Sequence, residues 1–156
     1  MTGRRRKPPE PTLLHANCVA LGGVGVLILG KPGSGKSDLT LRLIDAPGVG
    51  LGRKLVKATL VSDDQVLVRV RAGKLVASPP KTIAGLLEIR GLGIMRLPYR
   101  KSVPLALAVR LTPATQIERL PEPRRFAIAG LSLPLIDIDP AAAAAPARLR
   151  AALTGR

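Results

Sequence analysis

The alternation of apolar and polar positions along the chain predicts many short strands and two helices. Apolar stretches of strand length cover residues 13–21, 24–29, 58–62, 66–70, 74–77, 86–90, 104–111 and 131–138. Apolar residues at helical spacing predict a helix over 36–45, and an alanine-rich stretch predicts a second helix over 141–153. Because strands outnumber helices and hairpin turns join several of them, the pattern favours an α/β fold with a mixed β-sheet.

Glycine and proline mark the connections between these elements. Residues 22–23 are both glycine and predict a hairpin turn, and the glycine-rich stretch 48–57 predicts a mobile loop. Residues 112–130 hold prolines among charged residues, which predicts a long surface loop. The length of 156 residues indicates one domain, over 12–156, and the basic, proline-rich stretch 1–11 predicts a disordered tail.

The composition narrows the class of protein further. Cys18 is the sole cysteine, so no intramolecular disulfide can form and a reducing compartment, the cytoplasm, is expected. No apolar run reaches the ~20 residues that a membrane helix needs. The net charge of +15 would suit nucleic acid, but the basic residues are spread along the chain and Tyr99 and Phe126 are the only aromatic residues available for stacking. A polyphosphate ligand and an acidic protein partner are therefore favoured over specific nucleic-acid binding.

Residues 30–37 match the phosphate-binding pattern G-x-x-x-x-G-K-[ST] at every fixed position. The candidate nucleotide-binding residues are Gly30, Lys31, Pro32, Gly33, Ser34, Gly35, Lys36 and Ser37. Because this loop lies between a predicted strand and a predicted helix, glycine backbone N–H groups and the helix N-terminus can bind phosphate oxygens. Lys36 is placed to reach the β- and γ-phosphates, and the Ser37 hydroxyl can ligate Mg²⁺. The pattern predicts a nucleoside triphosphate site rather than an inert glycine-rich turn.

The chain has few acidic residues that could complete such a site. Asp63 and Asp64 follow an apolar strand, and because adjacent carboxylates repel each other, the pair implies a cation or a proton partner. The alternative is a pair of solvated turn aspartates. Glu88 precedes a glycine-rich segment, and taken alone it could equally form an ion pair with Arg90. His15 is the sole histidine, and taken alone a structural role is favoured for it.

Four of these features in this order resemble the catalytic domain of HPr kinase/phosphorylase, the bacterial enzyme that phosphorylates a serine of the phosphocarrier protein HPr. They are His15, the phosphate loop 30–37, Asp63-Asp64-x-Val66 and the segment Glu-Ile-Arg-Gly-Leu-Gly-Ile at 88–94. The resemblance covers about residues 13–153 and is greatest to the short form without the family's N-terminal domain. It implies a phosphate-loop kinase fold with a mixed β-sheet.

The resemblance also implies roles for individual residues. Asp63 would be the general base that takes the proton from the acceptor serine, His15 would hydrogen-bond Asp63, and Arg90 would help to fix the catalytic loop. The implied cofactors are ATP and Mg²⁺. The implied metal ligands are Ser37, Asp64 and Glu88. The implied partner is HPr, within a homo-oligomer that is a hexamer in the family. The reverse reaction, phosphorolysis of phospho-HPr to give pyrophosphate, would use the same aspartate.

The chain also departs from the family's pattern. Residues 48–57 form a stretch that the family usually lacks, residues 118–121 match a later arginine-bearing loop only loosely, and the C-terminal helical region is short. Two alternatives stay open from the sequence: an ATP-binding regulatory module without transfer, and a small-molecule kinase with a different acceptor. A GTPase is disfavoured because the base-reading pattern Asn-Lys-x-Asp is missing from the sequence.

Overall fold

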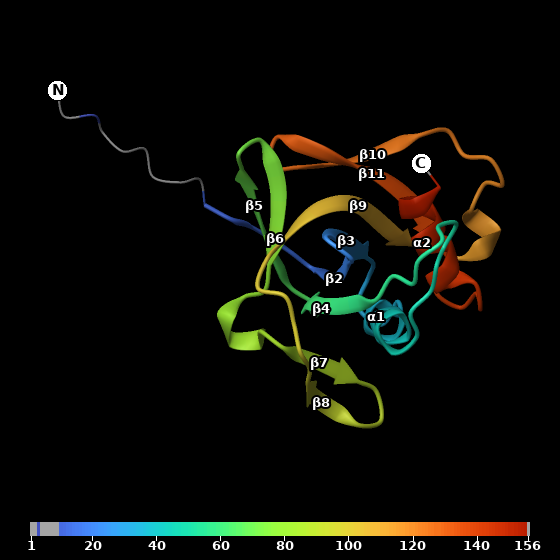
Figure 1. Ribbon diagram of the computed structural model, residues 1–156, viewed down its shortest axis with the longest axis horizontal. Helices are drawn as coiled ribbons and strands as arrows, with labels where there is room; N and C mark the ends of the chain where they lie inside the picture. The colour runs from blue at the N-terminus through green and yellow to red at the C-terminus, as the bar shows by residue number, and fades with distance from the viewer. Residues whose placement is uncertain (1–2, 4–9, 156) are drawn as a thin grey trace.

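A computed structural model of the chain describes residue 3 and residues 10–155 (Figure 1). Most of the predicted tail over 1–11 therefore lies outside the described residues. The described strands are β1 (Thr12–Leu14), β2 (Ala16–Leu21), β3 (Val24–Leu29), β4 (Ala58–Ser62), β5 (Val66–Arg71), β6 (Lys74–Ser78), β7 (Leu86–Ile89), β8 (Gly93–Arg96), β9 (Val103–Leu111), β10 (Arg124–Ile128) and β11 (Leu131–Ile138). The described α-helices are α1 (Lys36–Asp45) and α2 (Ala145–Thr154), and single 3₁₀ turns lie at Lys81–Ile83 and Ala114–Gln116.

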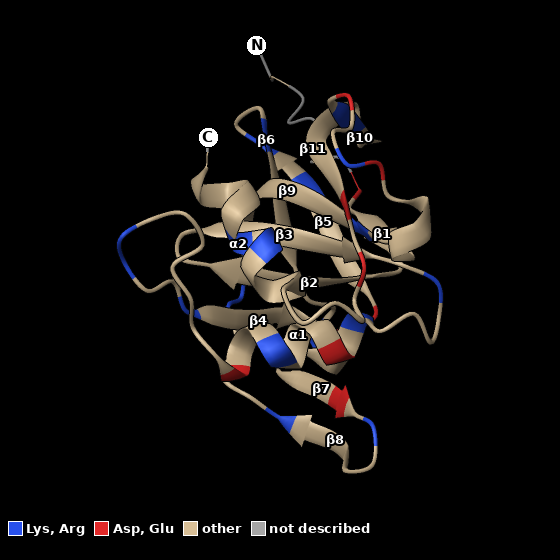
Figure 2. Cartoon of the chain, turned by 90° about the vertical axis from the view of Figure 1, so that its right-hand side faces the viewer, with Lys and Arg blue, Asp and Glu red and all other residues tan. Residues whose placement is uncertain are grey.

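The strands form one large mixed sheet and a separate hairpin. The main path of the nine-stranded sheet runs β1-β5-β6-β9-β3-β2-β4, and the antiparallel pair β10-β11 joins it through a parallel contact of β11 with β9. The central pair β3-β9 is also parallel, whereas β2-β3 and β5-β6 are antiparallel hairpins. Strands β7 and β8 pair with each other in a two-stranded sheet that projects from the body (Figures 1 and 2). The predicted α/β fold with a mixed sheet is confirmed.

Two aliphatic cores lie on the two faces of the sheet. On one face, α1 and α2 pack onto the sheet through residues that include Leu39, Leu43 and Leu149, each with an exposed fraction of 0%. On the other face, a second cluster includes Leu27 of β3 and the buried Cys18 of β2. Burial raises the pKa of the Cys18 thiol, so this side chain is an inert core residue rather than a nucleophile.

The structure differs from the predicted elements at four places. The expected strand over 13–21 is two strands, because the chain breaks at His15 and β1 pairs with β5 while β2 pairs with β3 and β4. The expected surface loop 112–130 contains β10, whose register against β11 gives its backbone a sheet partner. Strand β8 was not predicted. Helix α2 starts at Ala145 instead of 141, with Pro146 in its first turn, where a missing N–H costs nothing.

The predicted mobile loop over 48–57 is anchored to the rest of the domain. Its base is closed by a bridge between Gly48 and Val56, and the backbone N–H of Leu51 donates a hydrogen bond of 2.7 Å to the Thr154 hydroxyl of α2.

Within residues 3 and 10–155, no helix is long and apolar enough to cross a membrane.

Candidate active site

The phosphate loop (residues 30–37) joins β3 to the first turn of α1 and has the backbone geometry that its glycines permit. Gly33 and Gly35 have φ values of 77° and 101°, in the left-handed region where a Cβ is strained. A Cβ on Gly30 would lie 2.3 Å from the Ser34 hydroxyl oxygen, so a larger residue there would force the Ser34 side chain to move. No side chain caps the N-terminus of α1, which leaves backbone N–H groups of the first helical turn available to an anion.

Two side chains of the loop lack the partners that their chemistry calls for. The Lys36 ammonium is almost buried and donates to the carbonyl oxygens of Gly30 and Lys31 at 2.8 and 3.2 Å, and it makes no ion pair within the described part of the chain. The Ser34 hydroxyl oxygen is buried and has no hydrogen-bond partner among those same residues. A buried cation without an anion and an unsatisfied hydroxyl cost free energy unless a ligand completes them. The loop therefore fits a polyphosphate.

A cavity of about 830 Å³ opens beside the phosphate loop. The loop forms one wall, and the opposite wall carries Arg110 of β9, Arg124 of β10 and Asp137 of β11. Asp137 accepts hydrogen bonds from Arg110 at 2.9 Å, from Thr112 at 2.8 Å and from Arg124. Burial alone raises the pKa of the Asp137 carboxyl, but these hydrogen bonds outweigh it and hold the pKa below its usual value. Hydrogen bonds thus fix the two arginines and Asp137 in this lining, which also carries Glu118 and Glu122.

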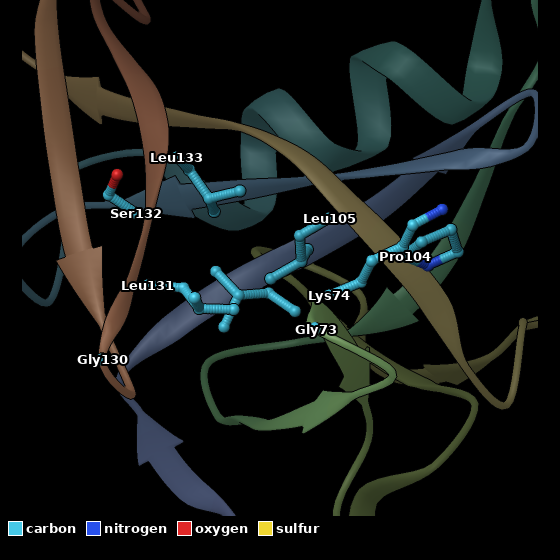
Figure 3. A pocket seen from close by; sticks show the side chains of 9 residues that line it. Gly73, Lys74, Pro104, Leu105, Gly130, Leu131, Ser132 and Leu133 are labelled. Atoms are coloured by element: carbon cyan, nitrogen blue, oxygen red, sulfur yellow. The ribbon is translucent and has the colours of Figure 1, made fainter.

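A second cavity, of about 600 Å³, lies away from the phosphate loop and holds none of the candidate site residues. It lies between the β5-β6 turn, β9 and the β10-β11 turn, and Figure 3 shows Leu105 and Leu131 extending into it from opposite sides. Lys74 is its single charged lining residue among the described residues. Of the two cavities, only the one beside the phosphate loop is lined by candidate site residues, namely Gly30, Lys31 and Ser34.

Asp63 lies at the end of β4, next to the first turn of α1. Its carboxylate accepts hydrogen bonds from the Ser37 hydroxyl at 2.6 Å, from the Asn17 side-chain amide at 2.9 Å and from the Glu88 backbone N–H at 2.9 Å. Asp63 is buried, with an exposed fraction of 8%. Three elements, β2, α1 and β7, thus fix one carboxylate beside the phosphate loop. The alternative of a solvated turn aspartate is wrong for Asp63.

Asn17 is the functional candidate that the sequence reasoning missed. It is fully buried on β2, donates to both the Asp63 carboxylate and the Thr40 hydroxyl at 2.9 Å, and accepts the backbone N–H of Asp64 at 2.8 Å. A signal for it was present, because an asparagine inside an otherwise apolar strand must find hydrogen-bond partners when the strand is buried. The expected partner, His15, is exposed and donates no hydrogen bond to Asp63 in the described structure.

The remaining candidate residues lie near Asp63 but are oriented to solvent. Asp64 is exposed and has a φ of 63°, and Glu88 and Arg90 of the hairpin are also exposed. Glu88 and Arg90 form no ion pair within the described residues, so that alternative is not supported. Over residues 3 and 10–155, no three acidic, histidine or cysteine side chains come together as a ready-made metal cage. A cation here would need oxygen ligands from a bound phosphate or from water in addition.

The fold and the site together define a phosphate-loop nucleotide-binding domain with a mixed sheet. The family model described as the HPr Serine kinase C-terminal domain matches residues 9–139, and the chain belongs to this family. It is 42% identical over 90 residues to an HPr kinase/phosphorylase of Clostridium tetani, and 41% identical over 87 residues to that of Clostridium botulinum (strain Eklund 17B / Type B). These alignments cover 58% and 56% of this chain.

The similarity to the curated relatives is local, whereas the similarity to a solved structure extends over nearly the whole chain. The chain spans about a quarter of the length of the curated relatives, 26% and 25%. The solved structure of an HPr(Ser) kinase/phosphatase from Coxiella burnetii superposes with a TM-score of 0.75 at 26% sequence identity. It covers 92% of this chain and 89% of the Coxiella chain. The family resemblance inferred from the sequence is thus confirmed.

Proposed function

We propose that this chain is an ATP-dependent protein kinase that transfers the γ-phosphoryl group to a serine of the phosphocarrier protein HPr. The single observation that carries the proposal is the buried Asp63 carboxylate, fixed 2.6 Å from the Ser37 hydroxyl at the start of the phosphate-loop helix. This placement sets a proton acceptor beside the expected position of the transferred phosphoryl group. The names of the matching relatives, HPr kinase/phosphorylase, support HPr as the acceptor.

The residues of the chain divide the work of transfer between binding and proton movement. The phosphate loop and Lys36 would hold the phosphate chain, because backbone N–H groups and a lysine ammonium are the groups that bind phosphate oxygens in such loops. Asp63 accepts the hydroxyl proton of the acceptor serine as its oxygen bonds to phosphorus and the bond to the nucleotide diphosphate breaks. Asn17, rather than His15, orients Asp63 in this proposal, since its amide bonds the carboxylate directly.

Mg²⁺ is part of the proposal, with the Ser37 hydroxyl and the nearby Asp64 and Glu88 carboxylates as the residues that would hold it. When bound, the cation would neutralise charge on the phosphate oxygens. The proposed ligands fit a hard cation because all are oxygen donors, and the exposure of Asp64 and Glu88 leaves space for water in the remaining positions. Arg90, on the turn of the hairpin, is proposed to help fix the catalytic loop.

The proposal has three further parts: a reverse reaction, assembly into a homo-oligomer and a cytoplasmic location. The reverse reaction would return the proton from Asp63 to the serine oxygen as inorganic phosphate attacks phosphoserine, which yields pyrophosphate. The chain is also proposed to assemble into a homo-oligomer, which the family resemblance implies is a hexamer. Light scattering would measure the size of the assembly. The lone Cys18 and the use of ATP support a cytoplasmic location.

The test is a transfer assay with γ-labelled ATP, Mg²⁺ and HPr, with wild-type HPr beside a variant whose acceptor serine is alanine. We expect label on wild-type HPr and none on the alanine variant. ATP binding without any label on HPr would overturn the kinase proposal and favour an ATP-gated regulatory module. Label on a small-molecule acceptor instead of HPr would favour the other alternative, a kinase of metabolites.

A further inference from the structure

The hairpin of β7 and β8 and the segment 97–101 that follows it expose several apolar side chains to solvent. We call this the hairpin surface and define it by its exposed apolar residues and the basic residues that flank them. The apolar members and their exposed fractions are Leu92 (67%), Ile94 (70%), Met95 (36%) and Tyr99 (38%). The basic members, all exposed, are Arg90, Arg96, Arg100 and Lys101.

The exposure of these residues is not a sign that the hairpin is detached. Leu87 of β7 is fully buried, and the Glu88 backbone N–H bonds the Asp63 carboxylate, so the root of the hairpin is fixed to the domain. Every residue of β8 is nevertheless exposed, and in the described structure β8 pairs with β7 alone. An isolated two-stranded hairpin is marginally stable in water, and a cluster of exposed apolar residues usually marks an interaction site.

The charge of the hairpin surface indicates the kind of partner. Residues 86–101 contain four basic residues and a single acidic one, Glu88. Figure 2 shows basic residues near both ends of β8 and the acidic patch confined to the end of β7. A complementary partner would have an apolar centre surrounded by acidic side chains, because like charges across an interface oppose association.

The position of the hairpin surface relates it to the proposed chemistry. Its root touches the carboxylate that is the proposed base, through the 2.9 Å hydrogen bond from the Glu88 N–H to Asp63. A macromolecule seated on the hairpin would therefore lie close to the segment that holds Asp63. We propose that the hairpin surface is the docking site of the protein acceptor, and that the acceptor binds it with an apolar, acid-rimmed face. This inference rests on the proposed function, since it requires a protein rather than a small molecule as acceptor.

The chain supplies a matched control surface in the loop over 48–57. Leu51 and Leu55 of this loop are 71% and 67% exposed, nearly equal to Ile94 and Leu92, and basic residues also lie between them. This loop is anchored to the C-terminal half of α2 and follows the end of α1 opposite the phosphate loop. A partner that binds exposed apolar and basic residues without regard to place would use both surfaces equally.

The experiment compares the double variant L92S/I94S with the control L51S/L55S in the full chain. HPr binding is measured by calorimetry without ATP, and the KM for HPr is measured in the transfer assay. We expect the hairpin variant to weaken HPr binding and raise this KM at least about tenfold, because a few apolar anchors carry most of the binding energy of an interface. We expect ATP affinity to stay unchanged in both variants, and HPr binding to stay unchanged in the control.

The outcomes of this experiment distinguish failure of the docking proposal from failure of the kinase proposal. If wild-type protein transfers phosphate but L92S/I94S keeps the wild-type KM, or if both variants lose binding equally, the docking proposal is overturned while the kinase proposal stands. If wild-type protein binds HPr without transfer and L92S/I94S abolishes binding, docking stands and the kinase proposal fails. A smaller assembly by light scattering with an unchanged KM would assign the surface to a second copy of this chain, which overturns the proposal.

A charge test addresses the acidic rim of the partner. R96E/R100E reverses two basic residues of the hairpin surface, and we expect it to raise the KM for HPr most strongly at low salt, where screening is weakest. The wild-type KM should rise with ionic strength, whereas the KM of the variant should depend on salt much less. An identical salt dependence in both proteins would contradict the proposed charge complementarity.

Discussion

The two ends of helix α1 are built in opposite ways. At the N-terminal end, the Ser34 hydroxyl has no partner in the described structure and Lys36 donates only to loop carbonyls. At the C-terminal end, the guanidinium of Arg150 from α2 donates to the carbonyl oxygens of Leu43 and Ala46 at 3.1 Å each and of Val56 at 3.2 Å. One end has unsatisfied groups, and the other end is closed by the protein itself.

The same electrostatics explain both ends. A helix has a partial positive charge at its N-terminus and a partial negative charge at its C-terminus, so an anion is favoured at the first and a cation at the second. Burial lowers the pKa of Arg150, but an arginine starts so high that it stays charged at neutral pH. The chain supplies the cation for the closed end and leaves the anion for the open end to a ligand. Variants at the open end should therefore change binding and transfer, and variants at the closed end should change stability.

The largest effect is expected from Asp63→Asn, which removes the proposed base at the open end. Transfer to HPr should fall about 10²–10⁴-fold in kcat, the usual contribution of general-base catalysis. ATP affinity should stay near that of the wild type, because the phosphate loop is intact. The measurement is kcat in the transfer assay beside a nucleotide titration. Retained transfer would place the base elsewhere.

The next largest effect is expected from Arg150→Ala, which opens the closed end. Three carbonyl groups lose their donor, and since a buried unsatisfied group costs about 1–3 kcal/mol, the free energy of unfolding should fall by about 2–4 kcal/mol. Urea unfolding checks this value. Arg150→Lys is the matched control and should recover part of the loss, since an ammonium keeps the charge but has a smaller reach. Equal stability of wild type and Arg150→Ala would refute the closure.

Lys36→Ala removes the proposed phosphate-binding cation at the open end, so it should change nucleotide binding more than stability, the reverse of Arg150→Ala. Nucleotide affinity should fall about 10- to 100-fold, because a charge-assisted hydrogen bond contributes about 1.5–3 kcal/mol and 1.4 kcal/mol corresponds to a factor of ten. In the absence of nucleotide, the free energy of unfolding should change less than for Arg150→Ala, because Gly30 and Lys31 are not buried and water can reach the two carbonyl oxygens that lose their donor. Calorimetric titration with ATP and urea unfolding measure the two effects. Unchanged affinity would remove Lys36 from the site.

The phosphate loop at the N-terminal end of α1 could be predicted from the sequence, whereas the Arg150 contacts at its C-terminal end could not. A phosphate loop is a local motif whose eight consecutive residues carry both the geometry and the chemistry, and its flanking strand and helix follow from local apolar patterns. Arg150 lies 94 or more residues from each carbonyl it binds, so no local pattern links them. The 48–57 loop was expected to be mobile for the same reason, because its anchor on Thr154 is a long-range contact.

The site shows the same division between local and long-range information. Asp63 and Glu88 could be singled out because acids are few, but the structure uses the Glu88 backbone N–H, which no side-chain pattern reveals. His15 was expected to be the partner of Asp63 on family resemblance, and Asn17 was not considered. The strand break at His15 and the pairing of β2 with β4 instead bring Asn17 to Asp63. Strand β10 was missed because prolines just before it suggested a loop, whereas its register with β11 is fixed by tertiary contacts.

The smallest effect is expected from Asp137→Asn in the cavity wall. Asp137 is the anionic partner of Arg110 and Arg124, whereas Lys36 has no such partner among the described residues. The folded-state pKa of Asp137 lies below its unfolded value of about 3.9, so its contribution to stability is complete above that pH and is lost as the pH falls through the folded-state pKa. Because both arginines are substantially exposed, we expect no more than about 1 kcal/mol. Urea unfolding at pH 7 and pH 3 should show a smaller drop for Asp137→Asn than for the wild type, since the amide does not titrate. Equal drops would mean that this carboxylate has the same pKa in both states, and that the cavity wall owes its stability to packing rather than to charge.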